Sequence, residues 1–191
     1  MNRPFKVLLI FLFFFCYYHP SEAQIPASGL VAYYPFNGNA NDESGNGNDG
    51  TVNGATLTVD RFGKSNSAYN LYGNDLNKIT LSPFTPPSII TISLWFNPVD
   101  AGPTTGLQGS TLFSNTEKFV NHDQVAVWMS GGVLTFYISN AAGTGYFVAS
   151  NSYISLNKWH HLVCTIDDQK QLKCILIMNF KLKLQHGVAH I

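Results

Sequence analysis

Short apolar runs separated by turn-forming residues make up most of the chain after its first two dozen residues. β-Branched and aromatic residues alternate with clusters of Gly, Asn, Pro and Asp, and no window keeps a helical apolar period for three turns. This pattern is typical of an all-β protein. The expected strands are residues 30–36, 51–59, 67–71, 78–81, 89–96, 111–114, 124–129, 133–139, 145–150 and 159–166.

The expected strand at 89–96 shows which side faces the core. Its even positions from Ile90 to Phe96 are apolar, whereas its odd positions are Thr91, Ser93 and Trp95. Because successive side chains of a strand point to opposite faces, the isoleucine face should point inward. Trp95 then either looks outward or fills a second contact.

Two further strands are joined by the sequence Ser130-Gly131-Gly132. Glycine tolerates a positive φ angle at little cost, and two-residue hairpin turns require it. The pattern therefore predicts a β-hairpin between 124–129 and 133–139. The core side of its second strand would carry Leu134, Phe136 and Ile138.

The stretch at 29–50 combines an aromatic segment with a loop of unusual composition. Between positions 37 and 50 only Ala40 and Ser44 are neither Asn, Gly, Asp nor Glu. Such a segment can neither pack a core nor form a helix. We expect an irregular surface loop.

The N-terminus has the features of an export signal. Arg3 and Lys6 precede an apolar run at 7–18, and a short polar tail ends in Ser21-Glu22-Ala23. A membrane anchor is the competing interpretation, but the run is shorter than the ~20 residues that a span needs. We therefore expect residues 1–23 to be a signal peptide and the protein to be secreted or at the cell surface.

The charge balance narrows the range of partners. The chain has 11 basic and 11 acidic residues, so it carries no electrostatic footprint for nucleic acid or for an anionic membrane. We expect no nucleic-acid partner and no membrane insertion once the signal is removed. The composition leaves the oligomeric state open.

Five motifs occur in an order that resembles a known family. They are GLVAYYPF at 29–36, the Asn/Gly loop at 37–50, RFGK at 61–64, TISLWF at 91–96 and KWHHL at 158–162. Together they resemble the laminin G-like, concanavalin A-like jelly-roll modules of secreted bacterial proteins. The resemblance implies an all-β sandwich of two antiparallel sheets over residues 24–172, often with one calcium ion at a sheet edge, and binding of carbohydrate or extracellular protein.

Residues 173–191 depart from the pattern of that family. Where the family continues with a strand resembling Tyr-Ile-Asp-Gly, this chain has Lys173-Cys174-Ile175-Leu176. One alternative is natural divergence of a final strand. We hypothesise instead that a shift of the reading frame, which could restore Tyr-Ile-Asp-Asn-Glu, produced this tail. The jelly roll would then be truncated and would lack its C-terminal strands, and the nucleotide sequence after Leu172 tests this.

The Asn/Gly loop contains the candidate metal site. Calcium prefers six to eight oxygen ligands from carboxylates, amides and backbone carbonyls. Asp42-x-Ser44-x-Asn46-Gly47 resembles half of an EF-hand, but its twelfth position is Asn53 rather than Glu. The family resemblance favours Asp42 with Gly73, Asn74 and Asp75 as the calcium site. A solvated turn without an ion is the alternative.

The sequence shows no pair of residues whose spacing is typical of a catalytic site. Glycosidases use two carboxylates that flank the scissile bond, and neither Glu-x-Asp nor Glu-x-Glu occurs here. His160 and His161 are adjacent on an expected strand and should point to opposite faces. Asp167-Asp168 is more typical of a turn. We expect a protein that is not an enzyme.

Aromatic rings are the usual platform for sugars, and the best candidates here are Tyr146, Trp128 and Tyr137. Tyr146 is flanked by a glycine loop and is expected to be the most exposed of the three. Cys164 and Cys174 could face each other across a hairpin, but we expect two free thiols because cross-strand neighbours are awkward for a disulfide.

Taken together, these features predict a secreted, non-catalytic module that binds carbohydrate or an extracellular protein with the help of calcium. The alternative is an inactive fragment of a larger surface adhesin or glycoside hydrolase.

Overall fold

The computed structural model describes residues 26, 28–72, 76–81, 87–103, 110–115, 124–140, 144–150, 152–169, 171–178, 181–186 and 189–190. It contains the strands β1 (Thr51–Asn53), β2 (Thr56–Thr58), β3 (Ala68–Asn70), β4 (Lys78–Thr80), β5 (Ile90–Phe96), β6 (Ser110–Ser114), β7 (Val125–Ser130), β8 (Val133–Ser139), β9 (Gly145–Ala149), β10 (His160–Ile166), β11 (Leu172–Met178), β12 (Lys181–His186) and β13 (Ala189–His190).

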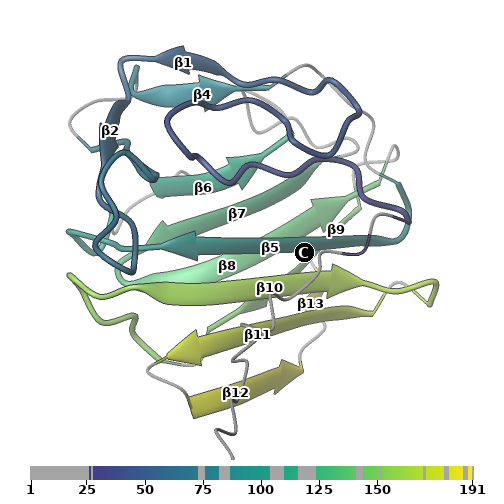
Figure 1. Cartoon of the computed structure of the whole chain (residues 1–191). Coiled ribbons are helices and arrows are strands. Elements are labelled where there is room, and N and C mark those ends of the chain that lie inside the picture. Colours follow the sequence, from purple (N-terminus) through teal and green to yellow (C-terminus); the bar gives the residue numbers. More distant parts are fainter. Residues whose placement is uncertain are drawn as a thin grey trace, which may run out of the picture.

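Two antiparallel sheets form a sandwich, as the family resemblance implies. The first sheet has the order β12-β11-β10-β5, and the second has the order β13-β9-β8-β7-β6. Figure 1 shows the first sheet in front of the second, with the small β1–β4 pair at one end of the sandwich. The remaining pair, β2–β3, joins neither large sheet.

The core lies between the two large sheets and follows the alternation of each strand. Phe96 and Leu162 from the first sheet pack in one cluster with Val127, Phe136 and Val148 from the second. In β5 the apolar even positions pack against this cluster, whereas the odd positions, Trp95 among them, are exposed. The predicted orientation of this strand is confirmed.

The hairpin between β7 and β8 is also confirmed. Ser130 pairs with Val133 across the turn, and Gly131 and Gly132 have φ angles of 55° and 79°. A turn with two positive φ angles matches the right-handed twist of the flanking strands. Phe136 of β8 is almost completely buried, as the pattern predicts.

The predicted strand at 30–36 is wrong, because this segment pairs with no other strand among the described residues. Hydrogen bonds from side chains of the Asn/Gly loop replace those that a neighbouring strand would make with this segment. The Nδ2 atom of Asn46 donates to the carbonyl of Leu30 at 2.7 Å, and that of Asn48 donates to the carbonyl of Val31 at 2.9 Å. The backbone of the segment is thus satisfied by local amides instead of by a neighbouring strand.

The predicted strand at 51–59 is in fact two strands. Gly54, with a φ angle of 65°, interrupts it. The change of direction lets β1 pair with β4 while β2 pairs with β3.

The tail at 173–191, whose sequence departs from the family pattern, continues the first sheet, and the shifted reading frame stays a hypothesis. β11 pairs with β10 along its whole length, from Leu172 opposite Ile166 to Met178 opposite His160. Leu172, Cys174 and Leu176 of β11 are buried in the core cluster. β12 adds a further strand next to β11, and β13 pairs with β9 in the second sheet.

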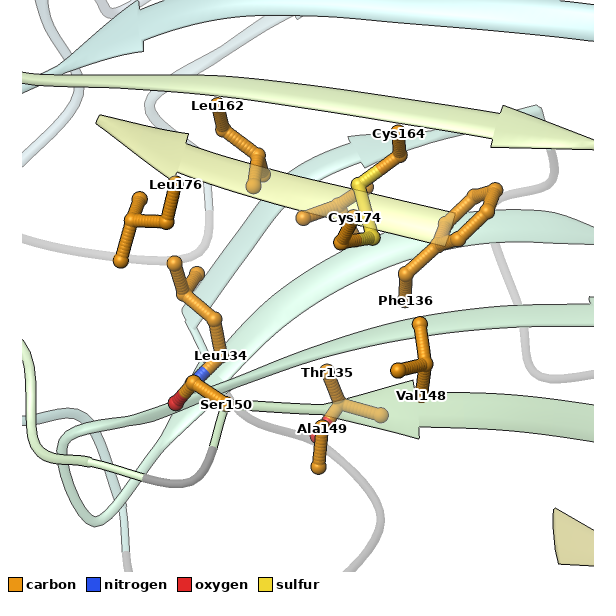
Figure 2. A pocket seen from close by; sticks show the side chains of 11 residues that line it. Leu134, Thr135, Phe136, Val148, Ala149, Ser150, Leu162, Cys164, Cys174 and Leu176 are labelled. Atoms are coloured by element: carbon orange, nitrogen blue, oxygen red, sulfur yellow. A yellow bond between two sulfur atoms is a disulfide. The ribbon is translucent and has the colours of Figure 1, made fainter. Parts of the chain in front are cut away.

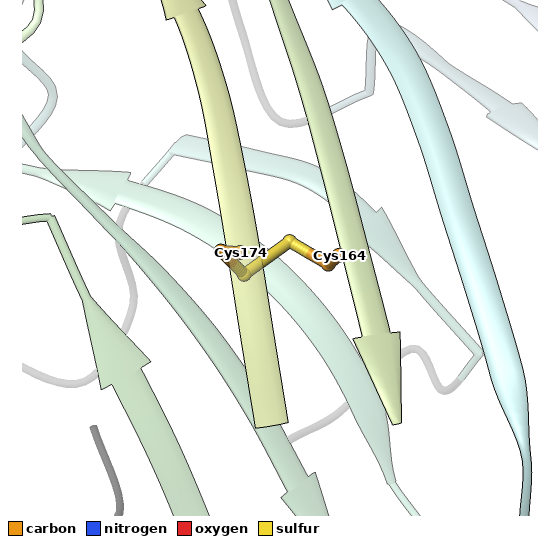
Figure 3. The surroundings of a disulfide bond; sticks show 2 residues. All are labelled: Cys164 and Cys174. Carbon is orange, nitrogen blue, oxygen red and sulfur yellow. A yellow bond between two sulfur atoms is a disulfide. The ribbon is translucent and has the colours of Figure 1, made fainter. Parts of the chain in front are cut away.

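The prediction of two free thiols is wrong, because Cys164 and Cys174 form a disulfide (Figure 3). The two residues face each other in the β10–β11 register, with their Cα atoms 4.3 Å apart. The bridge lies inside the sandwich, where both cysteines are buried. It joins the tail covalently to the neighbouring strand β10.

No helix in the described part of the chain has the length and hydrophobicity needed to cross a membrane.

Candidate functional site

The Asn/Gly loop is organised around the carboxylate of Asp42, which is only 9% exposed. Its Oδ1 atom accepts the backbone N–H groups of Tyr33 and Ser44, each at 2.9 Å, and Oδ2 accepts that of Asn48 at 3.0 Å. The backbone N–H of Asp42 in turn donates to Oδ1 of Asp49 at 2.8 Å. The Asp42 carboxylate thus connects Ser44 and Asn48 of the loop to Tyr33 in the segment before it.

These donors set the charge state of Asp42. Burial favours the neutral acid, but the Ser44 side chain and the N–H groups of Tyr33, Ser44 and Asn48 outweigh it and hold the pKa of Asp42 well below its usual range. The negative charges of Asp42 and Asp49 add to burial in raising the pKa of Tyr34 to about 12. The Tyr34 hydroxyl donates to the Asn48 carbonyl and closes the loop.

The predicted calcium ligands are only partly described. Gly73, Asn74 and Asp75 lie outside the described residues. Within the described ranges no three His, Cys, Asp or Glu side chains gather into a group that could hold a metal ion. The Asp42 carboxylate already accepts three backbone N–H groups. Calcium binding stays a prediction.

A calcium titration tests this site. If Asp42 and residues 73–75 bind calcium with the millimolar or submillimolar affinity of extracellular modules, 10 mM calcium should raise the melting temperature by about 5 °C. Magnesium at the same concentration is the control for ionic strength. The Asp75→Asn variant should lose the response, and a wild type without any response would contradict the site.

The three aromatic residues predicted to contact sugar are not displayed at the surface. Trp128 and Tyr137 lie close together, with ring centroids 5.9 Å apart, but both are buried with Ala126 on the face of the second sheet that points away from the main core. Tyr146 is half-buried and packs against the core; it is the most exposed of the three, as expected, but its ring is not fully displayed. A ligand role for these rings stays a prediction.

An exposed aromatic face is present instead on the outer side of the first sheet. Trp95 of β5 is 42% exposed and is paired in register with His161 of β10. Their rings stack with centroids 4.6 Å apart and planes within 4° of parallel. The Oγ atom of Ser93 lies 2.9 Å from Nε2 of His161. Burial first, and then the charge of Arg61, keeps the pKa of His161 below its usual value.

The turn between β2 and β3 adds two side chains to this face. Oδ1 of Asp60 accepts the backbone N–H groups of Phe62 at 2.8 Å and Lys64 at 2.9 Å, which fixes the turn. The Cζ atom of Arg61 then lies 4.4 Å from the centroid of the Trp95 ring and 4.3 Å from that of Phe62. Phe62 itself is 79% exposed. We call Arg61, Phe62, Trp95 and His161 the outer aromatic face.

The sequence contained part of the signal for this face. Alternation in β5 allowed an outward Trp95, and RFGK was noticed only as a motif of the resemblance. No local pattern indicates that Arg61 contacts Trp95, because the two are far apart in the chain. The outer aromatic face is therefore not among the sites that the sequence predicts.

The histidine pair behaves as the alternation predicts. His161 lies on the outer face, whereas His160 is buried beside Phe96 at a centroid distance of 5.4 Å. Nε2 of His160 lies 2.8 Å from the carbonyl oxygen of Ser155, so this nitrogen carries a proton and donates there. The two rings therefore do not form a metal pair.

A small cavity lies between the sheets, next to the disulfide (Figure 2). Its volume is about 20 Å³, and its lining includes Leu134, Phe136, Val148, Leu162 and Leu176. A space of this size holds about one water molecule and is lined mostly by apolar atoms. It is too small to take a sugar.

Comparison with known proteins gives one finding. A laminin G-type family model described as the concanavalin A-like lectin/glucanases superfamily matches residues 71–176, which is more than half of the chain. The matched part contains β5, β10 and most of β11, and with them Trp95 and His161. No curated protein and no solved structure matches the chain significantly.

Proposed function

This chain belongs to the concanavalin A-like lectin/glucanases superfamily, in its laminin G-like branch, and from this membership we propose that it is a non-catalytic module that binds extracellular carbohydrate through its outer aromatic face. Laminin G-like domains are in general binding modules for carbohydrates or proteins. Carbohydrate is favoured here by the kind of surface that the fold exposes.

The observation that carries the proposal is the exposure of Phe62 and Trp95 next to small hydroxyl side chains. Thr91 and Ser93 lie on the same side of β5 as Trp95 and are exposed. The exposed ring of Phe62 can accept the apolar face of a sugar, and neighbouring hydroxyl groups can bond its polar edge. The Trp95 ring is already stacked on His161 and contacted by Arg61, so its role is to support this surface. The core cavity offers no comparable surface.

Absence of catalysis is part of the proposal. Asp42 uses its carboxylate as an acceptor for backbone N–H groups, and Asp167 does the same for Gln169 and Gln171 in the turn after β10. Both carboxylates therefore support local structure. Release of reducing ends from a polysaccharide by the purified protein would contradict this part.

The proposal also includes export of the protein to the cell surface or the medium and assistance by calcium at the Asn/Gly loop. The predicted signal peptide supports export. Its residues lie outside the described part of the chain. An inactive fragment of a larger adhesin or hydrolase is the second candidate, and it predicts no binding by the isolated protein.

Substitution of exposed rings tests the binding face. A glycan array with the purified protein, with calcium or with a chelator, identifies the ligand. Phe62→Ala and Trp95→Ala should each weaken binding about tenfold, which corresponds to ~1.4 kcal/mol. Tyr153→Ala is the matched control, since Tyr153 is 77% exposed, close to the 79% of Phe62, but lies outside the face.

Equal loss in all three variants would contradict a role for this face in particular. Binding to no glycan at all would contradict carbohydrate recognition. Capture of a protein partner that depends on Phe62 and Trp95 would assign the same face to protein binding.

A further inference from the structure

Arg61 is held in place by aromatic rings and not by polar partners. Its Cζ atom is within 4.3 Å of the Phe62 centroid and 4.4 Å of the Trp95 centroid. Within the part of the chain that the structure describes, its guanidinium group makes no hydrogen bond and no ion pair. The group is therefore oriented while its N–H donors remain free, although the residue is at the surface.

An oriented guanidinium with free donors is suited to one kind of ligand group. Arginine presents five N–H donors in a planar fork that matches the two oxygens of a carboxylate or a sulfate. Stacking on an aromatic ring leaves the edge of the fork open. Because the rings already restrict the side chain, less conformational entropy is lost when an anion binds.

The charges around Arg61 favour an anion. Lys64 is exposed and lies on the same turn. Asp60, on the same turn, is negatively charged and its Oδ1 atom accepts the N–H groups of Phe62 and Lys64, so Asp60, Arg61 and Lys64 together carry a net charge of +1. Burial, and then the charge of Arg61, lower the pKa of His161 on the Trp95 ring, so the environment of this ring disfavours a second positive charge beside Arg61.

We propose that Arg61 binds the carboxylate or sulfate group of an acidic polysaccharide whose sugar ring lies against Phe62. This inference rests on the proposed function and makes it more specific, because neutral glycans would use the rings alone. It makes Arg61 the residue that determines specificity.

The test measures the affinity of the purified protein for four polymers. Polygalacturonate carries carboxylates, dextran sulfate carries sulfates, dextran is neutral, and poly-glutamate represents an acidic peptide. The wild type should bind at least one acidic polysaccharide, and more weakly as salt rises. Binding of polygalacturonate alone or dextran sulfate alone assigns the carboxylate or the sulfate.

Three variants distinguish a specific role of Arg61 in binding from the effect of positive charge in general. Arg61→Gln should weaken binding of the acidic polymer at least tenfold. Arg61→Lys should weaken it severalfold, since an ammonium group keeps the charge but lacks the fork. Lys158→Gln removes the same charge from an exposed position just before β10 and should change affinity less than twofold. Thermal melting confirms that each variant is folded.

The outcomes distinguish this inference from the proposed function. If the wild type binds neutral glycans but no acidic polysaccharide, or if Arg61→Gln binds the acidic polymer as well as the wild type, the anion site is wrong and carbohydrate binding still holds. Binding to no polysaccharide contradicts both. Binding of poly-glutamate alone, lost in Arg61→Gln, would reassign the site to an acidic protein and overturn the polysaccharide proposal.

Discussion

Replacing Asp42 with alanine should lower the free energy of unfolding by about 2–4 kcal/mol at neutral pH. The buried carboxylate accepts three backbone N–H groups, and hydrogen bonds to a charged group contribute about 1.5–3 kcal/mol each without being additive. Its loss leaves those donors to compete for water and frees the loop from Tyr33. Urea unfolding in the presence of a chelator measures the change without any contribution from calcium.

The contribution of Asp42 should depend on pH in a defined direction. Its pKa is lower in the folded protein than in the unfolded chain, where it is about 3.9. As pH falls, the unfolded chain takes up the proton first, so this stabilisation is complete above about pH 5 and is lost as pH falls through the folded-state pKa. Asp42→Asn, which does not titrate, should therefore differ most from the wild type at pH 6 and progressively less towards pH 3.

Glu43→Gln is the matched control for this prediction. Glu43 is a carboxylate of the same loop, but it is exposed and its Oε1 atom accepts only the Asn37 side chain. Surface changes of this kind usually alter stability by less than about 0.5 kcal/mol. If Asp42→Ala and Glu43→Gln unfold at the same urea concentration, Asp42 does not organise the loop.

Parts of the fold that depend on local periodicity could be predicted from the sequence. The inward face of β5 follows from alternation over seven residues, and the β7–β8 turn follows from Gly131 and Gly132. Both are properties of neighbouring residues. A shift of one residue in register would place every side chain of β5 on the opposite face of the sheet. The agreement between the predicted and observed faces therefore reflects a strong alternation in this strand.

Segment 30–36 could not be predicted in the same way. Its composition is that of a strand, but a strand also needs a partner, and partners come from distant parts of the chain. Here Asn46 and Asn48 satisfy the backbone of Leu30 and Val31 before another strand can. The Asn/Gly loop was correctly predicted to be irregular, whereas its role as a hydrogen-bonding substitute for a neighbouring strand required the structure.

The candidate site shows the same division between local and distant information. Trp128 and Tyr137 were candidates because they are aromatic, yet they are buried on the face of the second sheet that points away from the main core, and that burial depends on how the rest of the chain packs. Arg61 and Trp95 meet only because the β2–β3 turn reaches the outer side of β5. Periodicity gives the face of a side chain but not what covers it.

Removing the Cys164–Cys174 disulfide should lower the free energy of unfolding by about 2–4 kcal/mol. The bridge closes a loop between residues separated by 10 positions, and loops of this size give about that stabilisation by restricting the unfolded chain. The double variant Cys164→Ala/Cys174→Ala should show this loss, with a further cost because both sulfur atoms pack in the core. Urea unfolding of the wild type with and without reductant isolates the covalent part.

Peptide mapping without reductant gives the direct evidence for the bridge and for the tail that contains it. Trypsin cleavage at the lysines should release 159–170 and 174–181 as one linked pair that separates on reduction. Alkylation of both cysteines in the unreduced, denatured protein would restore the interpretation of two thiols. Detection of 174–181 would also show that residues after Lys173 are translated as given, and its absence from every digest would favour the shifted reading frame. The disulfide therefore links the stability of the sandwich to the question of whether β11 is a native part of it.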